Sequence, residues 1–151
     1  MRTFATLAEL ASCVGQPLGT SDWLTVDQSM IDAFAEATGD RQWIHVDVER
    51  ARRELPDGTT IAHGLLLLSL LPRLTATIYT VRQRSRGVSY GFDRVRFITP
   101  VPAGASVCID VVLDAALPLD GGVRLTFSST MRIAGATRPA LVAVTLAQLY
   151  D

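Results

Sequence analysis

An aspartate and a histidine separated by four residues are the side chains of this sequence best suited to acid–base chemistry. They are Asp40 and His45, in the segment Thr38-Gly-Asp-Arg-Gln-Trp-Ile-His45-Val-Asp47. A neutral imidazole and an ionised carboxylate that face one point can hold a water molecule and move a proton near neutral pH. The same spacing also suits a polar residue after a helix end, followed by a histidine satisfied in a loop or core. Spacing alone leaves both interpretations open.

Gly64 is a second candidate, because it stands at the start of the most apolar stretch of the chain. The first N–H groups of a helix have no intrahelical partner and carry the positive end of the helix dipole. They could therefore bind a carbonyl oxygen that becomes an oxyanion. A glycine here also lets a buried helix begin close to a neighbouring strand. The two interpretations are compatible, and we expect the adjacent His63 to cap or pack at this turn.

The basic side chains are all arginines, fourteen in number. Arg82, Arg84 and Arg86 alternate in one short segment, with Arg94 and Arg96 close behind them. Such a run is typical of a solvated face, and it could equally neutralise the phosphates of a small ligand.

The sequence lacks the residues that several other kinds of chemistry require. His45-Val-Asp47 alone supplies too few ligands for a metal centre, so we expect no metal. Cys13 and Cys108 have no metal-ligand spacing and are too few for a disulfide framework. Neither a Gly-rich phosphate loop nor a G-x-S-x-G nucleophile motif is present. Fourteen basic against fifteen acidic residues give a net charge of -1, which argues against a nucleic-acid partner.

The first half of the chain must position these residues through helices. Thr25-Val-Asp-Gln28 has the form of a capping box, and apolar residues at helical spacing lead from it to Gly39, which suits a helix end. Residues 48–55 predict a further turn or two. Leu65 to Leu71, followed by Leu74 and Ile78, predicts a helix that is apolar all round, surrounded by protein and bent at Pro72.

The second half predicts strands. Residues 88–97 alternate in hydropathy and then shift phase, which indicates a bulge. Apolar or alternating runs over 107–113, 123–133 and 141–149 predict three more strands, with Asp120-Gly-Gly122 as a hairpin turn. Helices followed by an antiparallel meander predict an α+β fold, with the sheet wrapped around the apolar helix.

Length and hydropathy limit the overall organisation. The 151 residues, 48% of them apolar and without repeats or linkers, predict a single domain over 1–151 with a substantial core. The apolar run Leu65–Leu71 is far shorter than the roughly 20 residues that span a bilayer. Glu9 interrupts the stretch where a secretory signal would be apolar. We therefore expect a cytoplasmic protein without a membrane span.

Three short motifs resemble one known family. Phe34-Ala-Glu-Ala-Thr-Gly39-Asp40, His45-Val-Asp47 and Thr60-Ile-Ala-His63-Gly64 follow in the order found in the MaoC-like dehydratases, the (R)-specific enoyl-CoA hydratases of the hot-dog fold. Arg96-Phe97 and Pro100-Val-Pro102-Ala-Gly104 also resemble the strand and turn after that family's central helix. The resemblance covers residues 23–150 and implies one antiparallel sheet wrapped around a central helix.

The resemblance also implies an activity. It is the addition of water to a trans-2-enoyl-CoA to give an (R)-3-hydroxyacyl-CoA, and the reverse dehydration. Asp40 and His45 would be the catalytic pair, with His45 favoured as the base, and the Gly64 N–H would donate to the thioester carbonyl. The implied substrate contacts are Ala62, His63, Gly64, Tyr90 and Arg96. Coenzyme A would belong to the substrate, so no cofactor is expected, and the partner would be a second copy in a homodimer.

One departure bears on the substrate. The commoner hydratase pattern has an Asn-Pro pair between the aspartate and the histidine, and this chain has Arg41-Gln-Trp-Ile44. The spacing of the pair is kept, but Gln42 and Trp43 could reshape the site for the acyl end.

Two other functions remain open on this fold. A non-catalytic acyl-CoA-binding module would keep the fold and lose the chemistry. A thioesterase would carry a carboxylate at or on the central helix, where Gly64 to Leu71 contains no acidic residue. We rank the hydratase first, the binding module second and the thioesterase third.

Overall fold

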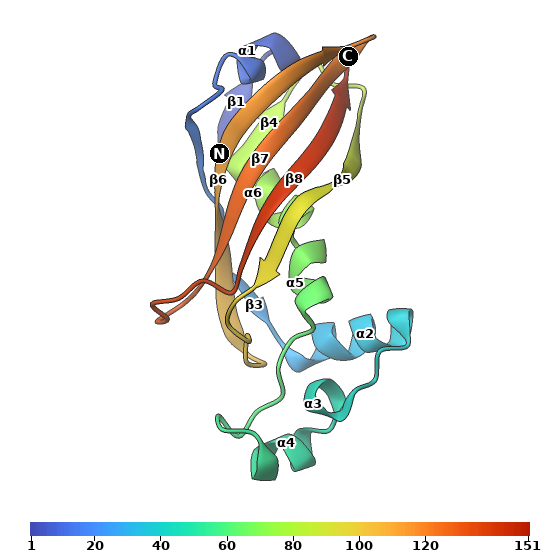
Figure 1. Cartoon of the computed structure of the whole chain (residues 1–151), viewed down its shortest axis with the longest axis vertical. Coiled ribbons are helices and arrows are strands. Elements are labelled where there is room, and N and C mark those ends of the chain that lie inside the picture. Colours follow the sequence, from blue (N-terminus) through green and yellow to red (C-terminus); the bar gives the residue numbers. More distant parts are fainter.

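The computed structural model describes all residues 1–151 and shows a curved sheet that encloses two consecutive helices (Figure 1). The main strands are β5 (Arg86–Phe97), β6 (Ala105–Leu119), β7 (Gly122–Ile133) and β8 (Leu141–Tyr150). The enclosed helices are α5 (Gly64–Ser69) and α6 (Leu71–Ile78). The predicted α+β architecture, an antiparallel sheet around a central apolar helical segment, is confirmed.

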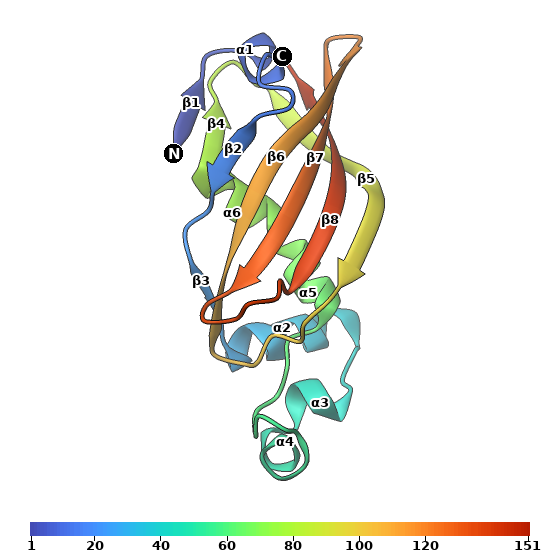
Figure 2. The same cartoon turned by 60° about the vertical axis from the view of Figure 1, so that its left-hand side comes forward.

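The sheet runs in the order β2-β6-β7-β8-β5, where β2 is Pro17–Thr20, and the short β3 (Leu24–Val26) also pairs with β6. Strands β6, β7 and β8 form the predicted meander, and Gly121 turns the first hairpin at a φ of 66°. The meander does not include β5, which pairs with β8 at the far edge. Residues 98–104 carry the chain beneath the sheet from β5 to β6 (Figure 2). Backbone bonds from Ala62 and Ala103 tie this link to the loop before α5.

Strand β5 contains the predicted irregularity. Its pairing with β8 shifts register between Ser89 and Gly91 and again between Phe92 and Arg94. Each shift leaves one extra residue on β5, and each extra residue changes which side chains face the helices. The phase change in the sequence is therefore a true bulge signal.

The central helix differs from the single bent helix that the sequence predicts. It breaks at Leu70, and Pro72 lies in the first turn of α6, where a missing N–H costs no intrahelical bond. It is also not surrounded on all sides, because Leu65 is 59% exposed. The buried residues follow one stripe along both helices, and Leu65 falls outside it; the stripe consists of Leu66, Leu67, Leu70, Leu71, Leu74 and Ile78.

Three short helices gather beyond one end of the sheet: α2 (Gln28–Thr38), α3 (Trp43–Val46) and α4 (Val48–Glu54) (Figure 1). Gly39 ends α2 with a φ of 78°, as predicted. The predicted N-cap was wrong. Thr25 lies in β3, and the Asp27 carboxylate accepts the N–H of Met30 at 2.9 Å instead. The four-residue α3 is too short for a periodicity signal.

The N-terminal segment forms β1 (Arg2–Phe4) and α1 (Leu7–Ala11), and β1 pairs in parallel with β4 (Tyr79–Val81) at the end of α6. None of the helices has both the length and the apolarity that crossing a membrane would require.

Candidate active site

Three ionisable side chains meet where the helical end of the molecule joins the central helix. Asp40 follows α2, His45 lies in α3, and His63 immediately precedes α5. Their carboxylate and ring-nitrogen atoms all lie within 4.8 Å of one another. We call these residues the Asp40–His45–His63 cluster. The sequence predicted that Asp40 and His45 face one point, and the structure brings them together.

The Asp40 carboxylate is held in place by its backbone and left free at its oxygens. Gly39 adopts a left-handed conformation, and the Asp40 N–H donates to Thr38 Oγ1 at 3.3 Å. The Asp40 carbonyl oxygen lies 2.9 Å from His63 Nε2. No side chain or backbone group of the protein donates to the carboxylate itself, and the residue is exposed. This carboxylate is therefore available to a water molecule or a substrate.

His45 is buried and has one free ring nitrogen. Its Nδ1 lies 2.6 Å from the carbonyl oxygen of Ile61. Because a carbonyl only accepts, Nδ1 carries the hydrogen and Nε2 presents a lone pair. Burial lowers the pKa of His45 below its ordinary value of 6.5, the Ile61 bond partly offsets this effect, and His63 lowers the pKa further. His45 is thus a neutral imidazole at neutral pH.

His63 was expected to cap or pack at the start of the helix, and the structure shows it packed inside the site. Only 2% of it is exposed, and its side chain makes no capping bond to α5. Its ring stacks on that of His45, with centroids 3.8 Å apart, and tilts against Phe34 at 5.0 Å. Since Nε2 donates to the Asp40 carbonyl, Nδ1 holds a lone pair, and this buried atom has no partner. Its signal in the sequence was scarcity, because it is one of only two histidines.

Gln28 supports the cluster from α2, a role that the sequence analysis missed by assigning this residue to a capping box. Its Nε2 donates to the carbonyl oxygen of His45 and to the carboxylate of Asp32, both at 2.8 Å. Its Oε1 accepts from the hydroxyl of Thr60. One side chain thereby joins α2, α3 and the loop that leads to α5.

Gly64 begins α5 directly beside the cluster. The first helical bond runs from Leu67 N–H to the His63 carbonyl, which leaves the N–H groups of Gly64 and Leu65 without an intrahelical partner. A Cβ at Gly64 would meet the ring of Phe97 at 3.0 to 3.1 Å. The close approach of strand and helix, expected for a glycine here, is therefore present. Ala62 is buried, and its N–H donates to the Val101 carbonyl.

Tyr90 and Arg96 do not reach the cluster within one chain. Arg96 pairs in the ladder with Val142, whereas its neighbour Phe97 pairs with the buried Leu141, so Arg96 lies on the sheet face opposite the helices. Tyr90 lies under the guanidinium of Arg124, which is 4.1 Å from the ring centre. Arg124 belongs to the same outer face of β7.

The cluster has the residue types of a cation site, but its geometry fits proton handling better. Two imidazoles bind one ion when their in-plane lone pairs converge at about 2.0–2.1 Å from it. Here the rings are stacked with centroids 3.8 Å apart and an interplanar angle of 27°, so the free lone pairs lie in separate, nearly parallel planes and do not converge. A free carboxylate beside a neutral imidazole can instead orient a water molecule and take its proton.

The chain is similar in sequence to several known proteins. Residues 9–116 match the model of the MaoC like domain. The chain is 47% identical to 3-hydroxyacyl-thioester dehydratase Z of Mycobacterium tuberculosis over 144 residues, which is 95% of each chain. It is 45% identical to nodulation protein N of Rhizobium meliloti over 139 residues, 91% of this chain and 86% of that one.

Among solved structures, the R-hydratase PhaJ1 of Pseudomonas aeruginosa superposes with a TM-score of 0.72. The match covers 96% of this chain and 85% of that chain at 23% identity, and so it supports the fold.

Proposed function

The chain belongs to the MaoC-like domain family, and from that premise we propose that it is an (R)-specific enoyl-CoA hydratase. Its relatives are named as dehydratases, so its reaction class is that of a hydro-lyase. The observation that carries the finer proposal is the free Asp40 carboxylate beside the free Nε2 of His45. The third member of the cluster, His63, directly precedes Gly64, where the unpaired helix N–H groups begin. A water molecule, a base and an oxyanion donor are the three requirements of hydration.

In the proposed mechanism, the Asp40 carboxylate and His45 Nε2 hold one water molecule. As the water oxygen bonds to C3 of the enoyl thioester, its proton passes to His45 and charge moves to the thioester oxygen. The Gly64 N–H donates to that oxygen, an interaction that strengthens as the charge develops. The imidazolium then delivers the proton to C2 on the same face, which restores neutral His45. Dehydration is the same sequence in reverse.

His45 is the better base of the pair. Burial lowers the pKa of His45 and keeps its imidazole neutral at pH 7, and its free Nε2 lone pair can accept a proton from the bound water. Asp40 then orients the water and stabilises the imidazolium that forms. No metal or cofactor enters this scheme, and coenzyme A belongs to the substrate.

We propose a homodimer as the working form, located in the cytoplasm. Strand β5 is the free edge of the sheet and pairs only with β8. Large apolar side chains remain exposed on it and near it in a single chain, namely Phe92 (44%), Phe97 (50%) and Leu65 (59%). A long edge strand with such neighbours favours a two-fold contact with a second copy. Sedimentation velocity tests this, and a monomer at micromolar concentration would refute it.

The central test is loss of the enoyl-thioester absorbance of crotonyl-CoA with the wild type, Asp40→Asn and Asp57→Asn. Asp57 is an exposed loop aspartate without side-chain bonds, so it controls for the change of charge. We expect Asp40→Asn to lose about 10²–10⁴-fold in kcat, the usual contribution of general acid–base catalysis, and Asp57→Asn to lose none.

Two results would contradict the proposal. Near wild-type turnover by Asp40→Asn would remove Asp40 from the chemistry. An inactive wild type that still binds crotonyl-CoA and octenoyl-CoA in calorimetry would favour the acyl-CoA-binding module. The thioesterase alternative lacks its group, since no acidic residue lies between Gly64 and Ile78.

A further inference from the structure

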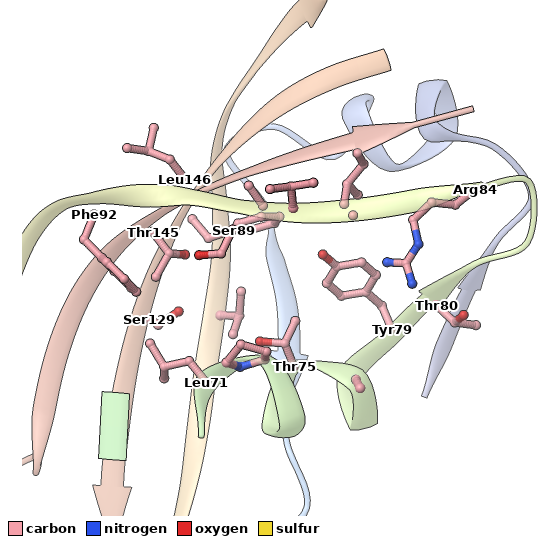
Figure 3. Close-up of a pocket in the computed structure, with 18 of the residues that line it drawn as sticks. Leu71, Thr75, Tyr79, Thr80, Arg84, Ser89, Phe92, Ser129, Thr145 and Leu146 are labelled. Carbon is pink, nitrogen blue, oxygen red and sulfur yellow. The ribbon is translucent and has the colours of Figure 1, made fainter. Parts of the chain in front are cut away.

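A cavity of about 470 Å³ lies between α6 and the inner face of the sheet, and none of the Asp40–His45–His63 cluster lines it (Figure 3). Its apolar walls come from both sides; they include Leu71 on α6, Phe92 on β5, Phe127 on β7 and Leu149 on β8. Its volume falls in the range of small-molecule sites.

Six hydroxyl groups and the Arg84 side chain line this largely apolar cavity, and none of the hydroxyls has a hydrogen-bond partner within the chain. The hydroxyls come from five elements: Ser89 on β5, Ser129 on β7, Thr145 on β8, Thr75 on α6, and Tyr79 and Thr80 on β4. Figure 3 shows the hydroxyls of Ser89 and Thr145 close together, with Ser129 and Tyr79 facing the same hollow. Ser129 is 4% exposed and Tyr79 is 8% exposed. Burial raises the pKa of Tyr79 to about 12, so its phenol keeps its proton and can donate.

Thr145 and Ser129 lie where close packing alone would select apolar side chains. Thr145 sits in the sheet between Phe92 and Phe127 on the neighbouring strands, and Ser129 sits beside Ala143 and Val111. Valine has the same shape as threonine and would fill the Thr145 position without a polar atom. A plain hydrocarbon that filled this cavity would cover these open hydroxyls and leave them without a partner, so an occupant with hydrogen-bonding atoms suits it better.

The cavity also lies in the direction that an acyl chain would take. Leu71, at its near end, is seven residues beyond Gly64 in sequence, which corresponds to about 10 Å of helix rise. Phe97 touches Gly64, and Phe92, on the same inner face of β5, lines the cavity. A thioester held at the Gly64 N–H would thus send a medium-length acyl chain along α5 and β5 toward these hydroxyls.

We infer that this cavity receives the far end of the acyl chain and selects chains that carry a hydroxyl or keto oxygen there over plain alkyl chains. The inference rests on the proposed hydratase function, because that function places the thioester at Gly64. The hydroxyls of Ser129 and Thr145 bind the substrate oxygen, and the aromatic and aliphatic walls hold the methylenes that precede it.

The test compares kcat/KM for hexenoyl-, octenoyl- and decenoyl-CoA with and without a terminal hydroxyl. For the best-fitting length we expect the hydroxylated substrate to be preferred by about tenfold or more, since a site built for a hydroxyl discriminates against its absence. Thr145→Val and Ser129→Ala should each reduce that ratio toward one. Thr126→Val is the matched control, because Thr126 pairs with Leu146 on the outer face, and it should keep the wild-type ratio.

If the preference for the hydroxylated substrate were the same in the wild type and in Thr145→Val at every chain length, the inference would be overturned. The hydroxyls would then bind ordered water only. Crotonyl-CoA separates this failure from failure of the hydratase itself, because its chain is too short to reach Leu71. If wild-type protein turns over neither crotonyl-CoA nor any of the longer enoyl-CoAs, the hydratase proposal fails on its own. Calorimetric binding of saturated acyl-CoA with and without the terminal hydroxyl then tests whether the cavity selects the hydroxyl. Equal affinities would refute that selectivity.

Discussion

His63 lies against His45, with the centroids of the two imidazole rings 3.8 Å apart. The His63 ring therefore borders the space in which His45 and Asp40 approach each other. The same ring donates from Nε2 to the Asp40 carbonyl and presses on Phe34. It therefore fixes the backbone of Asp40 and the ring plane of His45. We regard His63 as a positioning residue for the proposed reaction.

Replacing His63 tests this role. His63→Phe keeps an aromatic ring between Phe34 and His45 but removes the bond to the Asp40 carbonyl. We expect kcat for crotonyl-CoA to fall about tenfold or more, while the free energy of unfolding changes by only about 1 kcal/mol, the net value of a hydrogen bond. Urea unfolding and initial rates measure the two quantities. Because His63 lowers the pKa of His45, the acid limb of the pH–rate profile should also move to higher pH.

A purely structural His63 would behave differently. His63→Ala removes ring and bond together and should lower stability more than His63→Phe does. If activity followed stability in both variants and the acid limb stayed in place, His63 would be a packing residue only.

The pH dependence follows from the lowered pKa of His45. His45 must be neutral to accept a proton, so kcat/KM should be flat around pH 7 and fall only below the ordinary value of 6.5. The folded protein binds this proton more weakly than the unfolded chain, so stability should also decrease as pH falls from 6.5 through the folded pKa. Both slopes are measured from pH 5 to 8, and His45→Gln should remove the stability contribution. An acid limb above pH 7 would contradict the prediction.

The substitution Gly64→Ala has two opposing effects on the free energy of unfolding. Alanine in place of a helical glycine stabilises by about 0.5–1 kcal/mol, and overpacking costs about 1–3 kcal/mol. The new Cβ meets only the ring of Phe97, which is half exposed and can turn away. We expect unfolding free energy to change by less than about 1 kcal/mol, but kcat to fall because the displaced ring enters the space before the N–H. In a Phe97→Leu background the same change should cost less activity; an equal cost would exclude this steric cause.

Removal of divalent cations should not affect the reaction. The stacked imidazoles do not converge on one ion, so the proposed chemistry needs only protons and the substrate. Dialysis against a chelator should leave the crotonyl-CoA rate unchanged. A loss of activity that added Zn²⁺ restores would assign the Asp40–His45–His63 cluster to a metal.

The features predicted correctly from the sequence are those that repeat or follow a local rule. Gly39 ends α2, the phase change in residues 88–97 is a bulge, and Asp120-Gly-Gly122 turns a hairpin. These signals depend on neighbours along the chain, and a single sequence carries them fully.

The errors share another cause, which is competition from distant partners. Thr25 satisfies a capping pattern, but pairing with Ser106 in β6 holds it in a strand and passes the cap to Asp27. The position of β5 beside β8 likewise depends on long-range pairing that alternation cannot encode. The sequence also could not predict which groups His63 contacts, because Asp40 and His45 are brought to it only by the tertiary fold.

The hydrogen bonds of Gln28 have a consequence for how the site unfolds locally. Its amide joins the carbonyl of His45, the carboxylate of Asp32 and the hydroxyl of Thr60, so three segments share the bonds of one side chain. Segments that share bonds open together as one cooperative unit instead of fraying separately. Local opening would therefore dismantle the proposed catalytic pair all at once. Mild warming or denaturant would reduce the number of active molecules, while each molecule that remains closed would work at its full rate.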